Sequence, residues 1–135
     1  MKLLTVPPDA EHLAIDYLTT ALAARGEDVT VGVNIPATWT TTTKSHVQVM
    51  LIGTPEVEYP ILARASVGVT CWNSSTTTAK ALAALCMGLL CSHPGGDGVA
   101  SIRPLTGVLP TRDPDSGAQL AAISVRVNLR MTVPA

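Results

Sequence analysis

The sequence contains no phenylalanine, and aromatic residues make up only 3% of its 135 residues. Charged residues make up 14%, well below the roughly 25% that is usual for a globular protein. Hydrophobic residues reach an ordinary 47%, which argues against a disordered chain. Because a solvated monomer normally covers itself with charged side chains, we expect part of this surface to be covered by another chain in the working state.

Clusters of basic residues are also missing. The formal net charge is −1, with no basic run and no acidic tail. A duplex-binding surface needs grouped Lys and Arg to neutralise phosphates. Binding of single-stranded nucleic acid needs more aromatic side chains for base stacking than this chain has. Sequence-specific nucleic-acid binding is therefore not expected.

Long hydrophobic runs are missing as well. No apolar stretch reaches the eighteen or so residues that a membrane span needs. The nearest to that length, residues 79–91, is interrupted by Lys80 and Gly88. Residues 1–8 are too few and too rich in proline to hold the hydrophobic region of a signal peptide. We expect no membrane partner, and synthesis in the cytoplasm without export.

The three cysteines, Cys71, Cys86 and Cys91, are an odd number without the spacing of a disulfide framework. A zinc site would need a close pair of ligands and then a second pair, and neither is present. All three are therefore expected to be small buried hydrophobic residues.

Catalytic patterns are absent too. His12, His46 and His93 each stand at the end of an expected helix or strand, where a solvated histidine is the usual occupant. Asp113 and Asp115 flank a proline and are expected to form a turn. There is no nucleophile elbow, phosphate loop or dinucleotide fingerprint. We expect no enzymatic activity, no cofactor and no metal.

Two amphipathic helices are predicted. The first lies between Asp9, which can cap its free amides, and Gly26, which supplies a left-handed stop. The second follows a capping signal in the Asn-Ser-Ser segment 73–75, has a broad apolar face over residues 79–90, and ends at the His-Pro-Gly-Gly segment 93–96.

Alternation of apolar and polar residues predicts five strands, over residues 29–35, 46–52, 61–72, 99–102 and 123–131. A turn is expected at 53–55, and two long connections at 37–45 and 103–117. The order is helix, three strands, helix, two strands. It predicts a single α+β domain over residues 1–135, with a mostly antiparallel sheet and both helices packed on one face.

Six side chains are candidates for a subunit or partner interface: Trp39, Lys44, Arg64, Arg112, Arg126 and Arg130. Three of the arginines fall on the polar faces of the third and last strands, where a solvated sheet face is the alternative. The other three residues belong to the two long connections. Long connections without structure of their own are usually functional, and Trp and Arg are enriched in interface hot spots. We expect these connections to become ordered against a partner; the alternative for Trp39 is an incidental position in a surface loop.

Five segments match the pattern of a known family: Asp-Tyr-Leu at 16–18, Val-Gly-Val-Asn-Ile-Pro at 31–36, Val-Gly-Val-Thr-Cys-Trp at 67–72, the Ala-rich helix at 79–90 and the final strand at 123–130. With this element order, the chain resembles the tail terminator (tail completion) proteins of long, non-contractile-tailed bacteriophages. The family often carries Gly-Gly and an acidic residue between its second and third strands. This chain departs from that pattern and has Ile-Gly-Thr-Pro-Glu at 52–56.

The resemblance implies a virion protein at the junction of tail and neck, assembled in the host cytoplasm. It implies a ring, usually of six copies, that caps the tail tube, ends its polymerisation and docks to the head. The partners would be further copies of the chain, the major tail tube protein and the head-tail connector protein, and genome DNA would pass through the ring. Two alternatives stay open: another neck or tail component, such as a head-closure or tube protein, and a small oligomeric ligand-binding or hydrolytic α+β enzyme.

Overall fold

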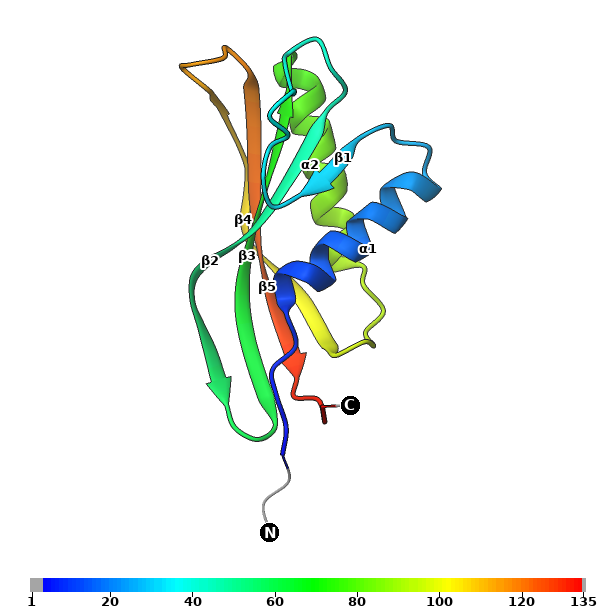
Figure 1. Ribbon diagram of the computed structural model, residues 1–135, viewed down its shortest axis with the longest axis vertical. Coiled ribbons are helices and arrows are strands. Elements are labelled where there is room, and N and C mark those ends of the chain that lie inside the picture. The colour runs from blue at the N-terminus through cyan, green and yellow to red at the C-terminus, as the bar shows by residue number, and fades with distance from the viewer. Residues whose placement is uncertain (1–3, 135) are drawn as a thin grey trace.

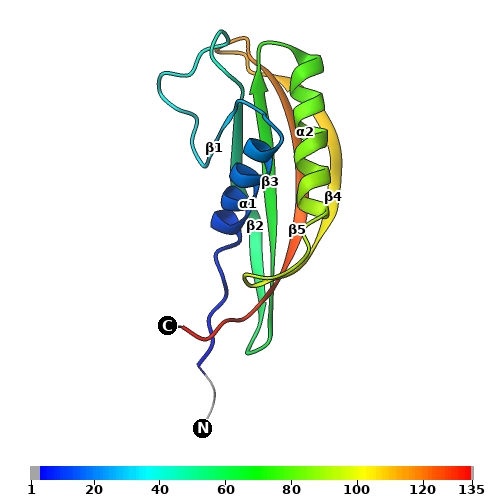
Figure 2. The same cartoon turned by 90° about the vertical axis from the view of Figure 1, so that its right-hand side faces the viewer.

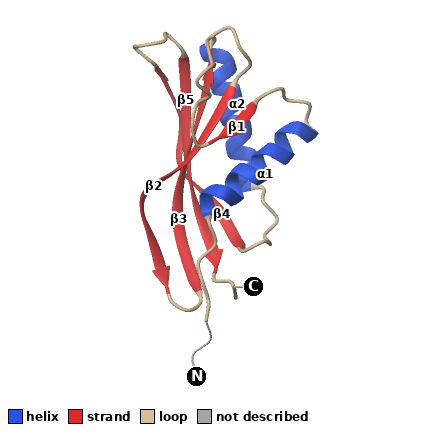
Figure 3. Ribbon diagram, viewed as in Figure 1, coloured by secondary structure: helices blue, strands red, loops and turns tan. Residues whose placement is uncertain are grey.

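The computed structural model describes residues 4–134. Two helices, α1 (Ala10–Ala24) and α2 (Thr76–Cys91), lie on the same side of a five-stranded sheet (Figures 1 and 3). The strands are β1 (Thr30–Gly32), β2 (His46–Glu58), β3 (Leu62–Asn73), β4 (Val99–Arg112) and β5 (Gln119–Arg130). The element order is the predicted one. The expectation about a signal peptide at 1–8 falls partly on residues 1–3, which lie outside the described residues.

The strand order across the sheet is β1-β2-β3-β5-β4. Every neighbouring pair is antiparallel except β1 and β2, which are parallel. The predicted α+β class, with a mostly antiparallel sheet, is therefore confirmed. β1 pairs only with residues 46–48 of β2, so the rest of β2 forms one edge of the sheet and β4 forms the other.

Both predicted helix caps are present. The Asp9 side chain accepts a hydrogen bond from the backbone amide of His12 at 3.1 Å, and the Ser75 hydroxyl accepts one from the amide of Thr78 at 3.4 Å. These bonds satisfy amides that the first turn of a helix leaves without partners. The chain leaves α1 through Gly26, whose φ of 77° is the left-handed conformation expected for a glycine stop.

The core lies between the helices and the inner face of the sheet, where the two helices lie in front of the strands (Figure 2). Each helix contributes one stripe of apolar side chains, and β3 and β5 contribute every second residue. The fully buried large side chains include Leu18 and Leu22 of α1, Leu90 of α2, Val67 and Ile123. This alternation is the period-two pattern that the sequence shows.

Two of the three cysteines belong to this core. Cys71 on β3 and Cys86 on α2 are buried, as expected, whereas Cys91 is exposed and the expectation for it is wrong. Cys91 is the last residue of α2, five positions after Cys86. Five residues in a helix correspond to about 500° of rotation, so the two side chains point to different sides of α2.

The predicted first strand was too long. β1 ends at Gly32 rather than at Ile35. Beyond it, the backbone oxygen of Val33 accepts a hydrogen bond from Gln48 Nε2 at 3.1 Å. At Val33 a hydrogen bond from the Gln48 side chain therefore takes the place of a backbone hydrogen bond between strands, although the apolar alternation continues to residue 35.

The turn predicted at 53–55 is also wrong. β2 runs through this segment to Glu58 with an irregular register between Ile52 and Glu56. The chain reverses only at the cis peptide bond between Tyr59 and Pro60. Gly and Pro that read as a turn instead mark a bulge in an edge strand, which is where proline is tolerated in sheets. Ile61, predicted to start an inward row, is 69% exposed beside this turn.

The largest correction concerns the predicted connection 103–117. Most of it belongs to β4, which continues to Arg112 with register shifts near Val99, Pro104 and Thr106. Each shift interrupts the period-two alternation, so the sequence pattern hides the strand. Only residues 113–118 turn the chain. There Asp113 Oδ2 accepts hydrogen bonds from the Ser116 amide at 3.1 Å and from its hydroxyl, in the expected role of a turn former.

Replacing Leu18 by Ala is expected to lower the free energy of unfolding by about 2–5 kcal/mol, since it leaves a cavity between α1 and the sheet. Thr20→Ala, at an exposed position of the same helix, is the control and should change stability by about 0.5 kcal/mol or less. Urea unfolding of both variants measures the two values. Equal effects of the two substitutions would contradict the packing of α1 described here.

Candidate assembly interface

The face of the sheet without helices carries most of the predicted interface residues. Arg64 of β3 and Arg126 and Arg130 of β5 alternate with buried residues and so lie on this outer face. Arg64 pairs across the ladder with Asn128, and Ser66 pairs with Arg126. Arg64 and Arg126 therefore lie diagonally opposite each other in neighbouring strands, and both line a shallow depression of this face.

A fourth arginine of this face was missed in the sequence. Arg103 of β4 stands directly opposite Arg126 in the β4–β5 ladder. Arg103 falls in the predicted connection 103–117 because the irregular register of β4 interrupts the alternation of apolar and polar residues. Like charges directly opposite each other in a sheet destabilise it. An anionic group bound beside the two arginines would offset this repulsion.

Arg64 differs from the other arginines of the outer face because it has carboxylate partners within its own hairpin. Its Nη1 atom lies 3.0 Å from Glu58 Oε1 and 3.8 Å from Glu56 Oε2. The hydrogen bond to Glu58, followed by the charge of that carboxylate, raises the pKa of Arg64 above its ordinary value.

No ion pair joins Arg103, Arg126 or Arg130 to a carboxylate within residues 4–134, and Arg126 Nε is buried without a hydrogen-bond partner there. These three arginines therefore leave the outer face with positive charge that the described part of the chain does not neutralise. An anionic partner is the group that this charge would attract.

Trp39 and Lys44 lie together in the connection 37–45. The indole Nε1 of Trp39 donates to the backbone oxygen of Lys44 at 2.8 Å, and the ring meets that of Trp72 edge-on at a centroid distance of 5.7 Å. Turn bonds from the Trp39 amide to Pro36 and from the Thr43 amide to Thr40 hold the backbone. The connection therefore consists of turns held by these bonds.

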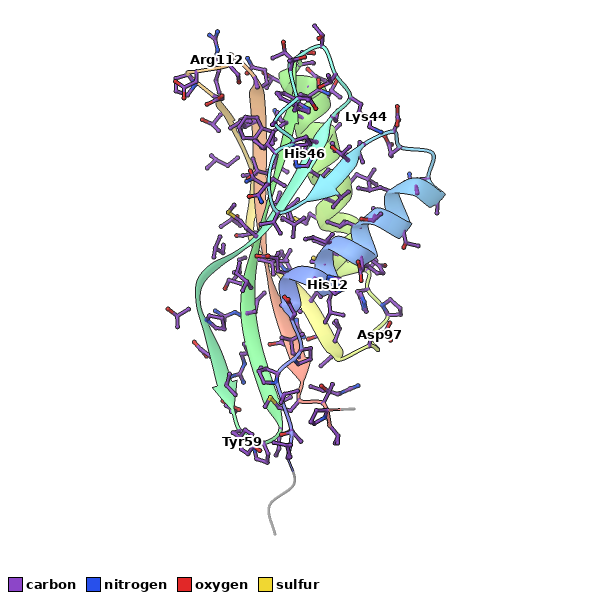
Figure 4. All side chains as sticks on the ribbon, viewed as in Figure 1. His12, Lys44, His46, Tyr59, Asp97 and Arg112 are labelled. Carbon is purple, nitrogen blue, oxygen red and sulfur yellow. The ribbon has the colours of Figure 1, made fainter. Side chains whose placement is uncertain are left out.

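Lys44 also forms an ion pair. Its Nζ lies 3.3 Å from Asp28 Oδ1, and the two side chains are 48% and 86% exposed, so solvent screens the pair and it contributes little to stability. Arg112 ends β4 and lies near Gly117 in the turn that follows. Arg112 and Lys44 lie toward one end of the molecule and Tyr59 at the other (Figure 4).

The six predicted interface residues thus do not form one site. The structure brings Arg64 and Arg126 together on the outer face, with Arg130 on the same face, and it joins Trp39 to Lys44 in one connection. Arg112 stands apart on the far edge strand. The sequence signal that would have found Arg103 is weak, because a proline follows it directly.

Each of the three histidines contacts a neighbouring side chain. His12 Nε2 lies 3.0 Å from Asp16 on the exposed side of α1. His93 Nδ1 accepts a hydrogen bond from the Gly95 amide at 2.9 Å, and its ring lies 4.5 Å from that of Tyr17. His46 is 2% exposed and its Nδ1 contacts Thr30 Oγ1, while its Nε2 finds no partner in the described residues. No serine or cysteine nucleophile is paired with a histidine base among the hydrogen bonds of residues 4–134.

Metal-binding clusters and reactive thiols are two further possible sources of chemistry. Within residues 4–134, no group of three or more His, Cys, Asp or Glu side chains is arranged to hold a metal ion. The Cys71 and Cys86 thiols contact each other in the core, and this contact together with burial raises the pKa of Cys71, so that its thiol stays protonated.

No helix in the described part of the chain is long and apolar enough to cross a membrane.

An open cleft of about 330 Å³ lies between residues 27–29, in the segment that follows α1, and residues 78–85 of α2. Its polar groups are the carboxylates of Glu27 and Asp28 and the hydroxyls of Ser45 and Thr78. The cleft contains no cysteine, histidine or basic side chain that could act with them as a nucleophile or base.

The same fold occurs in a solved structure described as the virion of a native gene transfer agent particle. One of its chains superposes with a TM-score of 0.63 over 90% of this chain and 92% of its own length, at 14% sequence identity. At this identity the likeness shows a shared fold. No protein-family model matches the sequence. No curated protein matches it either.

Replacing Trp39 by Ala is expected to lower the free energy of unfolding by about 1–2 kcal/mol, since the ring contact with Trp72 and the bond to Lys44 are lost. Thr38→Ala, at an exposed neighbouring position, serves as the control. Thermal unfolding measures both variants. A Trp39→Ala variant as stable as the Thr38→Ala control would show that these contacts of the indole do not stabilise the fold.

The buried His46 predicts a pH dependence of stability. Burial lowers its pKa below the ordinary 6.5. The unfolded chain therefore binds a proton first as the pH falls through about 6.5, and the folded state loses stability from there downward. Replacing His46 by Gln should flatten this decline between pH 7.5 and 5.5, because His12 and His93 are unchanged in both proteins. Denaturant midpoints that fall in parallel for the two proteins would show that His46 does not titrate in this way.

Proposed function

We propose that this chain is a structural virion protein that assembles as a closed homomeric ring, of six copies in the form that the resemblance implies. The ring caps the phage tail tube, ends its polymerisation and joins the tail to the head connector. The observation that carries the proposal is the shared fold, which extends over nearly the whole length of both this chain and its virion counterpart. The segments that resemble tail terminator proteins give the specific assignment.

The surface supports assembly rather than catalysis. Three arginines of the outer face have no carboxylate partner within the described residues, and two of them stand opposite each other. The low proportion of charged residues, 14%, fits a chain that covers part of its surface with neighbouring copies. In this role the partners are further copies of the chain, the tail tube protein and the connector, with DNA passing through the ring. No contact described above favours the enzyme alternative.

Removing this chain from a particle-producing cell should yield tails that are longer than normal and not joined to heads, because nothing ends tube growth. Supplying the chain again should restore both tail length and joining. Electron microscopy of the released particles measures the length distribution and the fraction of joined tails.

The same images separate the alternatives. Tails of normal length beside heads that have lost their DNA would indicate a head-closure protein, and an absence of tails would indicate a tube protein. Particles indistinguishable from normal would reject a role in the virion altogether.

A further inference from the structure

Large apolar side chains are exposed in an uneven way. Neither helix contains one of the eleven large hydrophobic residues that the described chain exposes. Nine lie on β2, on the turn after it and on the chain ends beside that turn: Leu4, Val6, Met50, Leu51, Ile52, Val57, Tyr59, Ile61 and Val133. The other two, Leu105 and Leu109, lie on β4. The exposed apolar surface therefore belongs to the two opposite edges of the sheet.

The chain ends belong to the β2 side because they are bonded to it. Thr5 Oγ1 donates to the backbone oxygen of Pro60 at 3.1 Å, and Val6 forms a bridge with Thr132. Figure 1 shows the described segments near both chain ends beside the turn of the β2–β3 hairpin. We call this surface, made of β2 beyond Gln48 and the turn after it, the β2 edge, and the exposed side of β4 the β4 edge.

The charges of the two edge strands are opposite. Beyond Gln48, β2 carries Glu56 and Glu58 and no basic residue, whereas β4 carries Arg103 and Arg112 and no acidic residue. Arg64 of β3 balances part of the charge on β2. Charge of opposite sign on two surfaces of one chain favours contact between copies and disfavours contact of either surface with itself.

The apolar and charged groups of the two edges also lie at matching heights. Following the ladder partners across the sheet, Ile52 is level with Arg103, and Leu51 with Pro104. Leu105 lies in the bulge between Pro104 and Thr106, the latter level with Met50. In a ring all copies lie at the same height along the axis. If the strands run nearly parallel to this axis, Leu105 of one copy lies against Met50 and Leu51 of the next.

The same comparison places the charges. Ile52 pairs with Ser66 of β3, and Glu56 pairs with Arg64, which is the next residue of β3 on the outer face. Glu56 therefore lies on the outer face, one outer-face position further along β2 than Ile52. Arg103 lies on the same face, opposite Arg126. An Arg103 side chain level with Ile52 of the next copy therefore lies within reach of Glu56, which supplies the anionic group that the arginines of the outer face lack.

Neither edge is built to continue the sheet by backbone hydrogen bonds. β2 contains Pro55 at its bulge, and β4 contains Pro104 and Pro110. The Leu51 amide already donates to Glu11 Oε2 of α1 at 2.9 Å. Proline, bulges and covered amides are the devices that keep sheet edges from pairing. Contact between the edges is therefore made by side chains.

Room for such contact is present on the β2 edge. Leu51, Pro55 and Val57 line an apolar groove of about 320 Å³, whose other wall is formed by Pro7, Pro8 and Ala10 at the start of α1. Leu105 of a neighbouring copy, at the height of Leu51, can enter this groove.

We propose that the β2 edge of one copy receives the β4 edge of the next, with Leu105 against Met50 and Leu51 and Arg103 beside Glu56. The occupant of the β2 edge is thus a second copy of this chain. Because the two edges differ, the contact is head-to-tail, and such contacts generate a ring when the rotation closes. This inference rests on the proposed ring and names the surfaces that form it.

Chemical crosslinking tests the pairing of surfaces. Met50→Cys and Leu105→Cys are combined in a Cys91→Ser background, which removes the exposed native thiol. A short bismaleimide is then added to assembled particles. The double variant should give a ladder of crosslinked chains up to the full ring, and each single variant should give no crosslinked dimer. The control combines Leu105→Cys with Ala84→Cys on the exposed side of α2 and should give no ladder.

Crosslinked dimers from either single variant would show a two-fold contact and overturn the proposal. So would a ladder of equal yield from the control pair, or no ladder from the double variant. Mass measurement of the wild-type assembly is made in parallel. A wild-type ring without the Met50–Leu105 ladder rejects these surfaces but leaves the ring function standing, whereas the absence of any wild-type ring rejects both.

An exchange of charge tests the polar part of the same contact. Arg103→Glu should raise the protein concentration needed for half-maximal assembly at least about tenfold, since it places like charges together. Adding Glu56→Arg to this variant should return that concentration to within about threefold of wild type. A double variant that assembles no better than Arg103→Glu alone would overturn the assigned pairing of Arg103 with Glu56.

Discussion

The uninterrupted pairing of β3 with β5 is the constraint on which the rest of the structure depends. The two strands are matched residue for residue from Leu62 opposite Arg130 to Asn73 opposite Gln119, without a register shift. This regularity keeps every second side chain of both strands on the same face for their whole length. One face is therefore apolar from Ala63 to Cys71 of β3 and packs against the helices, while the other face carries Arg64, Arg126 and Arg130. A slip of one residue would exchange the two faces.

Irregularity is confined to the strands outside this pair. β2 and β4 contain all the register shifts of the described sheet, and they also contain its prolines. A proline in a central strand would remove a hydrogen bond from the ladder, whereas at an edge its missing amide can face away from the sheet. The centre thus carries the stability of the fold. The edges are free to carry exposed apolar groups and unbalanced charge, which are the features of a contact surface.

The helices pack into the core, whereas the edges of the sheet carry the exposed apolar residues. The exposed sides of α1 and α2 carry no large hydrophobic residue, and their buried stripes are used in the core. Helix α1 has a second role, because Glu11 accepts a hydrogen bond from the backbone amide of Leu51. This amide of the β2 edge is then not available to pair with a strand of another chain. Contacts with other chains are thereby limited to side chains, which favours a defined number of copies over open-ended strand addition.

The sequence by itself determined the helices, the capping residue Asp9, the capping segment 73–75, the regular strands and the order of elements, because each depends on local periodicity or on a capping residue. It also determined that three arginines lie on the outer face. Only the tertiary structure decided the extent of β2 and β4, since bulges break the alternation that marks a strand. Only the tertiary structure placed Arg103 opposite Arg126 and level with Ile52. It also placed the half-buried Trp39 side chain against Trp72. Such contacts join residues far apart in the chain, and local sequence carries no measure of their register.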